Sequence, residues 1–183
     1  MHYKYPSIGN NRITICEGVS IMHTIKYLIG LPIIELREGS QIAKVRDVVL
    51  NFESNSIATI VHNYNRSISH QDIQSYGRDA VVIRDKDVLH KDIQFKDIKT
   101  YILSSMLLGK TIISECGVSL GILTDVFFDD QSGELKEYEI SESFLTDILY
   151  GRKYMPIPAV QIIGNKKIIV PETTVKLLHP YNN

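Results

Sequence analysis

Two aspartates, Asp47 and Asp125, are the residues of this sequence best placed to do chemistry. Asp47 lies in a β-like stretch, on the same face as Ala43, Val45 and Val49, so its carboxylate belongs to an apolar face. A carboxylate in such a place needs hydrogen-bond donors, because burying it without them costs a large desolvation free energy. In one interpretation each aspartate accepts backbone N–H groups of a neighbouring turn and closes the fold. In the other, the two aspartates are a pair of proton-handling carboxylates.

The spacing of the aspartates favours the structural interpretation. The sequence contains two similar stretches, and each stretch contains one of the two aspartates. A feature of the scaffold is repeated when a unit is duplicated, whereas an active site rarely is. We therefore expect an Asp125→Ala variant to have a markedly lower melting temperature.

Other patterns of catalytic or metal-binding residues are incomplete. The stretch 129–134 is acidic but lacks the alternating carboxylates and the distal glutamate of an EF-hand, so we expect a hairpin turn. His62 and His70 are close in sequence but have no Cys or Glu partners at zinc spacing. The sequence contains no glycine-rich phosphate loop and no nucleophile elbow. It therefore predicts no catalytic residue, no cofactor and no metal ion.

One segment combines basic and aromatic residues, in the order Tyr150, Gly151, Arg152, Lys153 and Tyr154. Such interleaving is typical, in a weak form, of a platform on which RNA bases stack. The alternative is a loop that two tyrosines anchor to the fold. We treat Tyr150, Arg152, Lys153 and Tyr154 as a candidate partner surface. The formal net charge of −1 gives the whole chain no general attraction for nucleic acid.

The elements that position these residues occur twice, as an internal repeat. Each copy opens with a Gly-x-x-Ile motif and continues with a β-branched stretch that contains the aspartate. The matched stretches are 29–34 with 108–113, 42–50 with 120–128, and 68–83 with 155–170.

Short strands and turns dominate each copy. The patterns predict strands over 42–50, 57–61 and 135–140, and closing hairpins that return over 80–83 and 167–170. Gly133 and its counterpart Asn55 suit left-handed turn positions. Phe144, Leu145, Ile148 and Leu149 have helical spacing, with Ser143 as N-cap and Gly151 as stop. This helix is an insertion of the second copy. The expected fold is all-β with short helices, as small antiparallel barrels or sandwiches.

The repeat divides the chain into two domains. We expect an N-terminal extension over 1–21, a first domain over 22–90, a linker over 91–106, a second domain over 107–178 and a tail over 179–183. The linker is either a short helix that holds the domains together or an extended segment. The extension has no counterpart in the second copy. Glu17, Gly18 and Val19 can be encoded by a purine-rich run like a ribosome-binding site, so Met22 is a candidate native start.

The ordered set of motifs resembles the PRC-barrel domain. The resemblance rests on Gly30 and Asp47 in the first copy, and is stronger in the second, through Gly109, Gly121, Asp125 and Gly133. It implies two tandem small antiparallel PRC-type β-barrels that bind other macromolecules and share no catalytic residues. Relatives that the resemblance implies are the H subunit of the photosynthetic reaction centre, the C-terminal domain of a ribosome maturation factor, and stand-alone bacterial proteins, some associated with sporulation.

These expectations lead to a functional prediction. Cys16 and Cys116 form no CxxC motif, which favours a reducing cytoplasm, and no apolar run approaches the ~20 residues of a membrane helix. We expect a non-catalytic cytoplasmic adaptor that binds a protein partner and that forms a homodimer through exposed strand edges. The resemblance further implies an association with sporulation. The alternative is an RNA- or ribosome-associated maturation factor.

Overall fold

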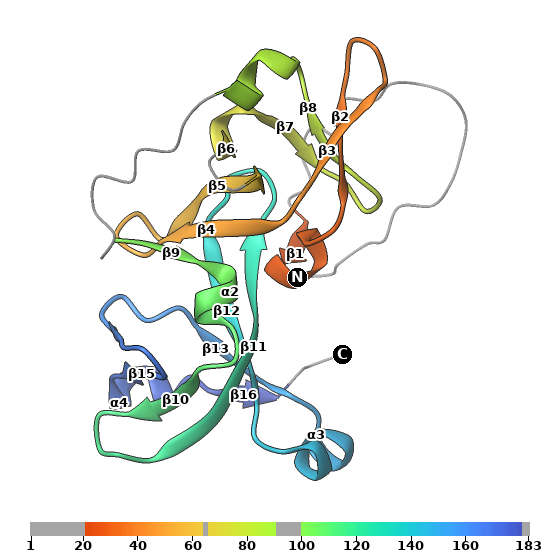
Figure 1. Cartoon of the computed structure of the whole chain (residues 1–183). Coiled ribbons are helices and arrows are strands. Elements are labelled where there is room, and N and C mark those ends of the chain that lie inside the picture. The colour runs from red at the N-terminus through yellow and green to blue at the C-terminus, as the bar shows by residue number, and fades with distance from the viewer. Residues whose placement is uncertain (1–20, 64–65, 91–99, 181–183) are drawn as a thin grey trace.

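Strands make up most of the regular structure. The computed structural model describes residues 21–63, 66–90 and 100–180 (Figure 1). We use first half for residues 21–90 and second half for residues 100–180. The strands of the first half are β1 Met22–Thr24, β2 Pro32–Glu35, β3 Gln41–Lys44, β4 Asp47–Asn51, β5 Ser56–Asn63, β6 Arg66–Ser69, β7 Ile73–Tyr76 and β8 Val81–Ile83. Those of the second half are β9 Tyr101–Leu103, β10 Thr111–Ser114, β11 Ser119–Asp129, β12 Leu135–Ser141, β13 Lys153–Pro156, β14 Ile162–Ile163, β15 Lys167–Val170 and β16 His179–Pro180.

The helices are short. They are α1 Ile25–Leu28, α2 Ser104–Leu107, α3 Phe144–Tyr150 and α4 Glu172–Val175, with 3-10 turns at His70–Asp72 and Lys86–His90. Among the described residues, no helix has the length and apolar character that crossing a membrane requires.

The strands form three open sheets. The largest has the order β14-β15-β10-β11-β12-β13-β16, with β1 added on β11. The other two have the orders β3-β2-β8-β7 and β6-β5-β4-β9. None of these sheets closes on itself within the described residues, so the prediction of two tandem barrels is not confirmed. Most pairs are antiparallel as expected, but β8 runs parallel to β2 and β15 runs parallel to β10.

The two halves exchange their leading strands. β1 pairs with β11 of the second half, with His23 opposite Phe128. β9 pairs with β4 of the first half, with Ile102 opposite Leu50. Each leading strand runs directly into a short helix, α1 or α2, which follows it into the other half (Figure 1). The described part of the predicted linker is therefore a strand and a helix that hold the halves together; residues 91–99 lie outside the described residues.

The tips of two hairpins also interlock. The Ile57 N–H donates to the Gly133 carbonyl at 2.8 Å, and the Leu135 N–H donates to the Asn55 carbonyl at 2.9 Å. Asn55 and Gly133 both have positive φ, 50° and 69°, as their turn chemistry predicts. Since Ile57 corresponds to Leu135 and Asn55 to Gly133, the two bonds are counterparts of each other.

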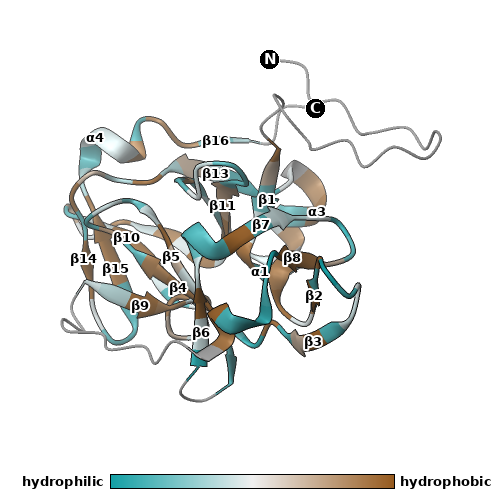
Figure 2. Cartoon of the chain, turned by 90° about the horizontal axis from the view of Figure 1, so that it is seen from above, coloured by the Kyte–Doolittle hydropathy of each residue, from teal (hydrophilic) through white to brown (hydrophobic). Residues whose placement is uncertain are grey.

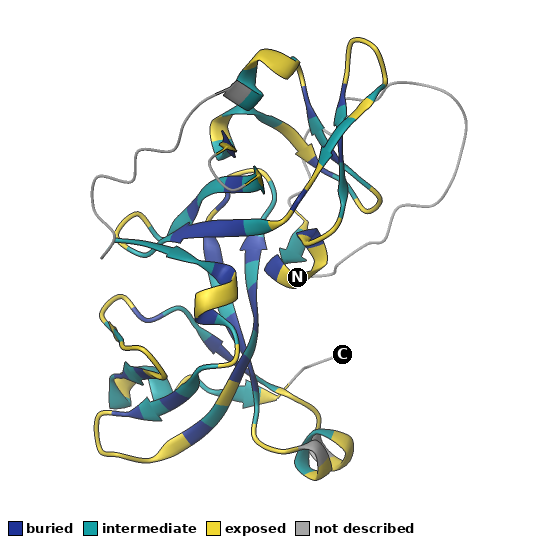
Figure 3. Cartoon of the chain, in the orientation of Figure 1, coloured by how far each residue is buried: buried dark blue, intermediate teal, exposed yellow. Residues whose placement is uncertain are grey.

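One apolar core spans both halves. The Tyr76 ring packs edge-on against Phe128 at 5.3 Å between centroids, and Phe52 packs against Tyr138 at 6.4 Å. Buried side chains of both halves, from Ile25 to Val170, form a single cluster. Figure 3 shows this burial concentrated where β4 crosses β11 and β12, and Figure 2 shows the apolar strands with polar connecting turns. The exchange thus accompanies one hydrophobic core that both halves share.

The predicted boundaries of elements agree with the structure in several places. β5, β12 and β15 cover the predicted strands, and both closing hairpins are antiparallel pairs. The predicted strand 42–50 is interrupted at Val45 and Arg46, which separate β3 from β4. The predicted tail begins with β16, which pairs with β13. The N-terminal extension lies outside the described residues except for Ile21, so the choice between Met1 and Met22 stays a prediction.

Candidate functional site

Asp47 lies at the start of β4 and receives the leading helix of the second half. Its Oδ1 accepts the N–H of Val48 at 2.7 Å and the N–H of Ser105 at 3.2 Å. The hydroxyls of Ser104 and Ser105 also donate to this carboxylate. Three of these four donors therefore come from α2, whose first turn has N–H groups without partners inside the helix.

Asp125, in β11, likewise receives the leading helix of the first half, α1. Its Oδ1 accepts the N–H of Lys26, in α1, at 3.0 Å and the N–H of Val126 at 2.8 Å, and the Thr24 hydroxyl also donates to the carboxylate. Asp125 is 6% exposed. Burial raises the pKa of this carboxyl, and the hydrogen bonds from Lys26, Val126 and Thr24 oppose that rise.

Each signature aspartate thus binds the start of a helix from the other half. One backbone N–H donor to each aspartate comes from the exchanged segment, and the other comes from the next residue of its own strand, Val48 or Val126, and not from a neighbouring turn. Most of the acceptor capacity of both carboxylates is used by these bonds, so a role in proton transfer would require the helices to leave. We interpret the aspartates as residues that position the exchange.

Glycine is needed at the four signature positions for different physical reasons. Gly30 and Gly109 have φ of 89° and 86° just after α1 and α2, where a residue with a side chain would be strained. Gly121 has φ of 130°, and a Cβ built on it would lie 2.4 Å from the Ser141 carbonyl oxygen. A Cβ on Gly133 would lie 2.6 Å from the His70 ring. Gly121 and Gly133 are therefore required by close neighbours as well as by φ.

The candidate partner surface at Tyr150–Tyr154 is largely neutralised. Arg152 Nη1 lies 2.5 Å from Glu139 Oε2, and Lys153 forms an ion pair with Glu142. Tyr154 is buried, and its hydroxyl donates to Glu139 Oε1 at 3.2 Å. Its aromatic ring packs against Phe127 and is not available for a base to stack on. The side chain of Tyr150 lies outside the described residues. The segment joins the end of α3 to the start of β13, and its described side chains are engaged within the fold.

Glu139 is the residue that the sequence argument missed. It is 9% exposed in β12 and also accepts the Thr124 hydroxyl at 2.7 Å. Its sequence counterpart in the first half is Val61, and the counterpart of Thr124 is Arg46. The sequence signal for this site was that an acidic residue, Glu139, replaces the apolar counterpart Val61, and that a basic residue, Arg152, follows in the insertion.

The network around Glu139 fixes the inserted helix α3. Arg152 also lies 3.8 Å from Asp147 of α3, and Asp147 accepts the Ser141 hydroxyl at 2.6 Å. The Ser143 hydroxyl accepts the Thr146 N–H, and Gly151 ends the helix with φ of 76°, so both predicted helix ends are confirmed. The short helix therefore has a defined position at the edge of the second half (Figure 1).

The apolar side chains of α3 are exposed. Leu145, Ile148 and Leu149 are 71%, 64% and 71% exposed. The predicted helical spacing therefore places these apolar side chains at the surface. The side chain of Phe144 lies outside the described residues. Large exposed apolar side chains held together on one element are typical of surfaces that bind other proteins.

A second feature is an open hollow beside β3, with a volume of about 500 Å³. Lys44, Arg46, His62 and Asn63 line it together with Gly30 and the apolar side of β3. Burial lowers the pKa of His62, and nearby Arg66 lowers it further, against a hydrogen bond to the Leu89 backbone. None of the described residues that line it is acidic.

The described residues contain no group of three or more His, Cys, Asp or Glu side chains that could hold a metal ion. His70 contacts Tyr76, with Nδ1 2.8 Å from the hydroxyl, while His62 lies at the hollow. Cys116 is exposed, and Cys16 lies outside the described residues.

Comparison with known proteins bears on the second half. No curated protein is similar enough to the chain to count as a match. Residues 99–177 match the PRC-barrel domain. This range begins just before β9 and so includes the strand and helix that the second half donates to the first. It also contains Asp125, α3 and the Glu139 network. Residues 99–177 are therefore a PRC-barrel domain.

Proposed function

We propose that this protein is a non-catalytic, cytoplasmic adaptor that binds a protein partner through the exposed face of α3. The observation that carries the proposal is the group of three exposed apolar side chains, Leu145, Ile148 and Leu149, on one fixed helix. A PRC-barrel domain supports a binding or adaptor role in general. We further propose that the first half is a second PRC-type unit, because its leading strand, its helix and its aspartate have counterparts in the second half.

The position of α3 supports this role. The ion pairs of Arg152 with Glu139 and Asp147 hold the loop after the helix, so the apolar face is presented without first becoming ordered. A preorganised surface loses less conformational entropy on binding than a mobile one. The first half has no corresponding helix among its described residues. The insertion is therefore the feature that distinguishes this chain's surface from the scaffold.

Affinity capture with matched variants tests the proposal. Leu145→Ser with Leu149→Ser removes the apolar face, and Val160→Ser removes a single side chain that is 73% exposed elsewhere in the second half. We expect one protein to be retained by the wild type and by Val160→Ser and lost by the double variant. Retention of the same proteins by all three would contradict the proposal. Because some proteins that the motifs resemble are associated with sporulation, extracts of growing and sporulating cells should be compared.

A second copy of the chain is one partner that this surface could accept. Sedimentation velocity of the purified protein decides this case, because an α3 contact between copies would give a dimer that the double variant does not form. The RNA-associated alternative is weaker in the structure, since Arg152 and Lys153 are paired with carboxylates and Tyr154 is buried.

A further inference from the structure

The hollow beside β3 has an open strand edge. β3 is the last strand of its sheet, and within the described residues it pairs only with β2. In the second half, the counterpart backbone at Ile122 and Leu123 lies in β11 and pairs with Ser141 and Ile140 of β12. The first half lacks this pairing because β5 turns into β6 at Asn63. An edge strand of this kind presents backbone N–H and C=O groups that another strand can pair with.

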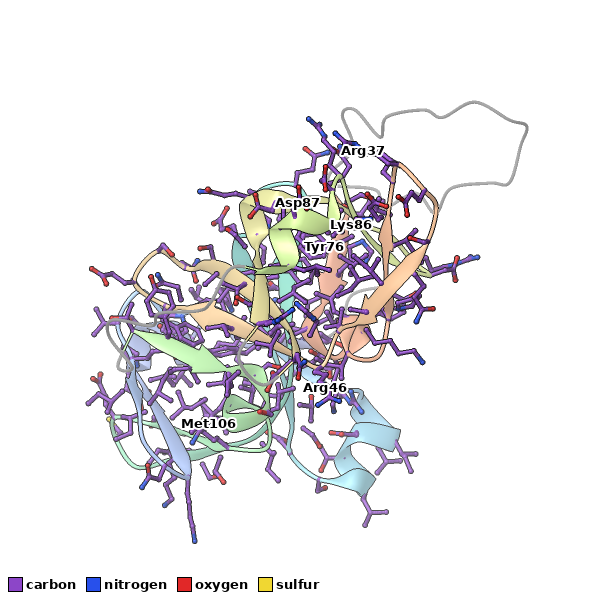
Figure 4. All side chains as sticks on the ribbon, turned by 45° about the horizontal axis from the view of Figure 1, so that its top comes forward. Arg37, Arg46, Tyr76, Lys86, Asp87 and Met106 are labelled. Carbon is purple, nitrogen blue, oxygen red and sulfur yellow. The ribbon has the colours of Figure 1, made fainter. Side chains whose placement is uncertain are left out.

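The rim of the hollow is cationic. Lys44 and Arg46 are exposed at one side, and Arg66 is exposed beside His62. Among the described residues, no carboxylate lies within ion-pair distance of Lys44 or Arg66. Arg37 and Lys86 pair with Asp85 and Glu38 instead, and Figure 4 shows them at the opposite end of the first half from Arg46. The hollow therefore favours an anionic ligand.

We propose that the β3 edge binds an extended acidic peptide segment, which adds as a strand beside Gln41–Lys44 and places carboxylates near Lys44 and Arg66. Main-chain hydrogen bonds would give the affinity and the charges the selectivity, as in other cases of strand addition. A nucleic acid is the weaker candidate, because none of the described residues that line the hollow is a Tyr, Phe or Trp on which bases could stack. The β3 edge is separate from α3, so an experiment can contradict one of the two proposed binding sites without contradicting the other.

Fluorescence anisotropy with synthetic probes tests this inference on the full chain. The probe is a fluorescein-labelled peptide of alternating glutamate and valine. The comparison probes are the same peptide with lysine for glutamate, the same peptide N-methylated at alternate residues, and a single-stranded oligouridine. We expect binding of the glutamate peptide only. Equal binding of the N-methylated peptide would contradict strand addition, and stronger binding of oligouridine, or no binding of the glutamate peptide, would overturn the proposal.

Charge-reversal variants locate the probe. Lys44→Glu with Arg66→Glu should raise the Kd by about tenfold or more. Lys166→Glu, at an exposed lysine of the second half, should leave it within about twofold. The α3 double variant should also bind within about twofold, which separates this site from the proposed adaptor surface. Amide hydrogen exchange should slow at residues 41–44 when the probe binds. Equal weakening by Lys166→Glu, or unchanged exchange at 41–44, would overturn the assignment.

Discussion

The two halves of the molecule use the same contacts to join each other and different structures at their outer edges. Asp47 and Asp125 each bind the helix that the other half donates, and the hairpin tips at Asn55 and Gly133 bond to each other. Beyond these contacts the halves differ. In the second half β11 is one continuous strand beside β12, and β12 leads to α3, whereas in the first half the strand is interrupted at Val45 and β3 has an open edge. The comparison indicates that the junction is structural and that the edges are where binding differs.

The largest expected effect tests this difference at one pair of positions. Gly121→Ala brings a Cβ to 2.4 Å from the Ser141 carbonyl oxygen at φ of 130°, so we expect a loss of about 3 to 5 kcal/mol in the free energy of unfolding. The matched control is Ala43→Gly, the counterpart in the first half, which should cost only about 0.5 to 1 kcal/mol. Urea denaturation measures both. Similar losses from the two substitutions would show that the edges are packed alike.

The second prediction concerns the junction. Asp125→Ala removes the acceptor of two N–H groups, those of Lys26 and Val126, and should cost about 2 to 4 kcal/mol. Asp125→Asn keeps an oxygen at the position of Oδ1, which accepts both bonds, and should cost less than about 1 kcal/mol. Thermal and urea unfolding distinguish the two variants. An Asn variant as unstable as the Ala variant would show that the charge matters and not the acceptor.

A smaller effect separates the two hairpin tips. Gly133→Asn introduces a Cβ within 2.6 Å of the His70 ring, so His70 must move and we expect a loss of about 2 kcal/mol. Asn55→Gly keeps the positive φ and loses only the bond from Asn55 Nδ2 to the Leu135 carbonyl, which should cost about 1 kcal/mol. The order of the two midpoints in urea is the result to check. The reverse order would show that His70 does not limit the second tip.

The smallest effect is a dependence on pH. Burial raises the pKa of Asp125 in the folded protein, so the folded state holds this proton more tightly than the unfolded chain. Its contribution therefore favours folding below the ordinary value of 3.8 and is lost as the pH rises through the raised pKa. The wild type should lose stability relative to Asp125→Asn over this rise. Urea titrations of both proteins from acidic to neutral pH measure the difference, and a gain by the wild type would reverse the sign of our argument.

Local sequence patterns predicted the local elements well. The span of β15 at Lys167–Val170 and the caps of α3 at Ser143 and Gly151 follow from residue types and spacing, because turns and helix ends are determined by nearby residues. The exchange of β1 and β9 could not be predicted in this way. Each is a strand of three residues, too short to have a periodic pattern, and its partner lies far along the chain.

The candidate site was predicted only in part. The sequence indicated that Asp47 and Asp125 needed donors, but not that α2 and α1 supply them. Arg152 and Lys153 were read as a basic cluster because their acidic partners, Glu139 and Glu142, lie on a neighbouring strand or beyond its end. The hollow at β3 could not be anticipated, since it depends on where β5 turns away from β3 and not on any one residue.

Native-state hydrogen exchange most directly tests the central claim that the two halves form one unit through exchanged segments. The measurement follows the slowest amides of β4 and β12, in the wild type and in Asp47→Ala. We predict that the substitution lowers the free energy of opening equally in β4 and in β12, although the hydrogen bonds described for Asp47 go to β4 and α2 and not to β12. A loss confined to the first half, with β12 amides unchanged, would contradict the account.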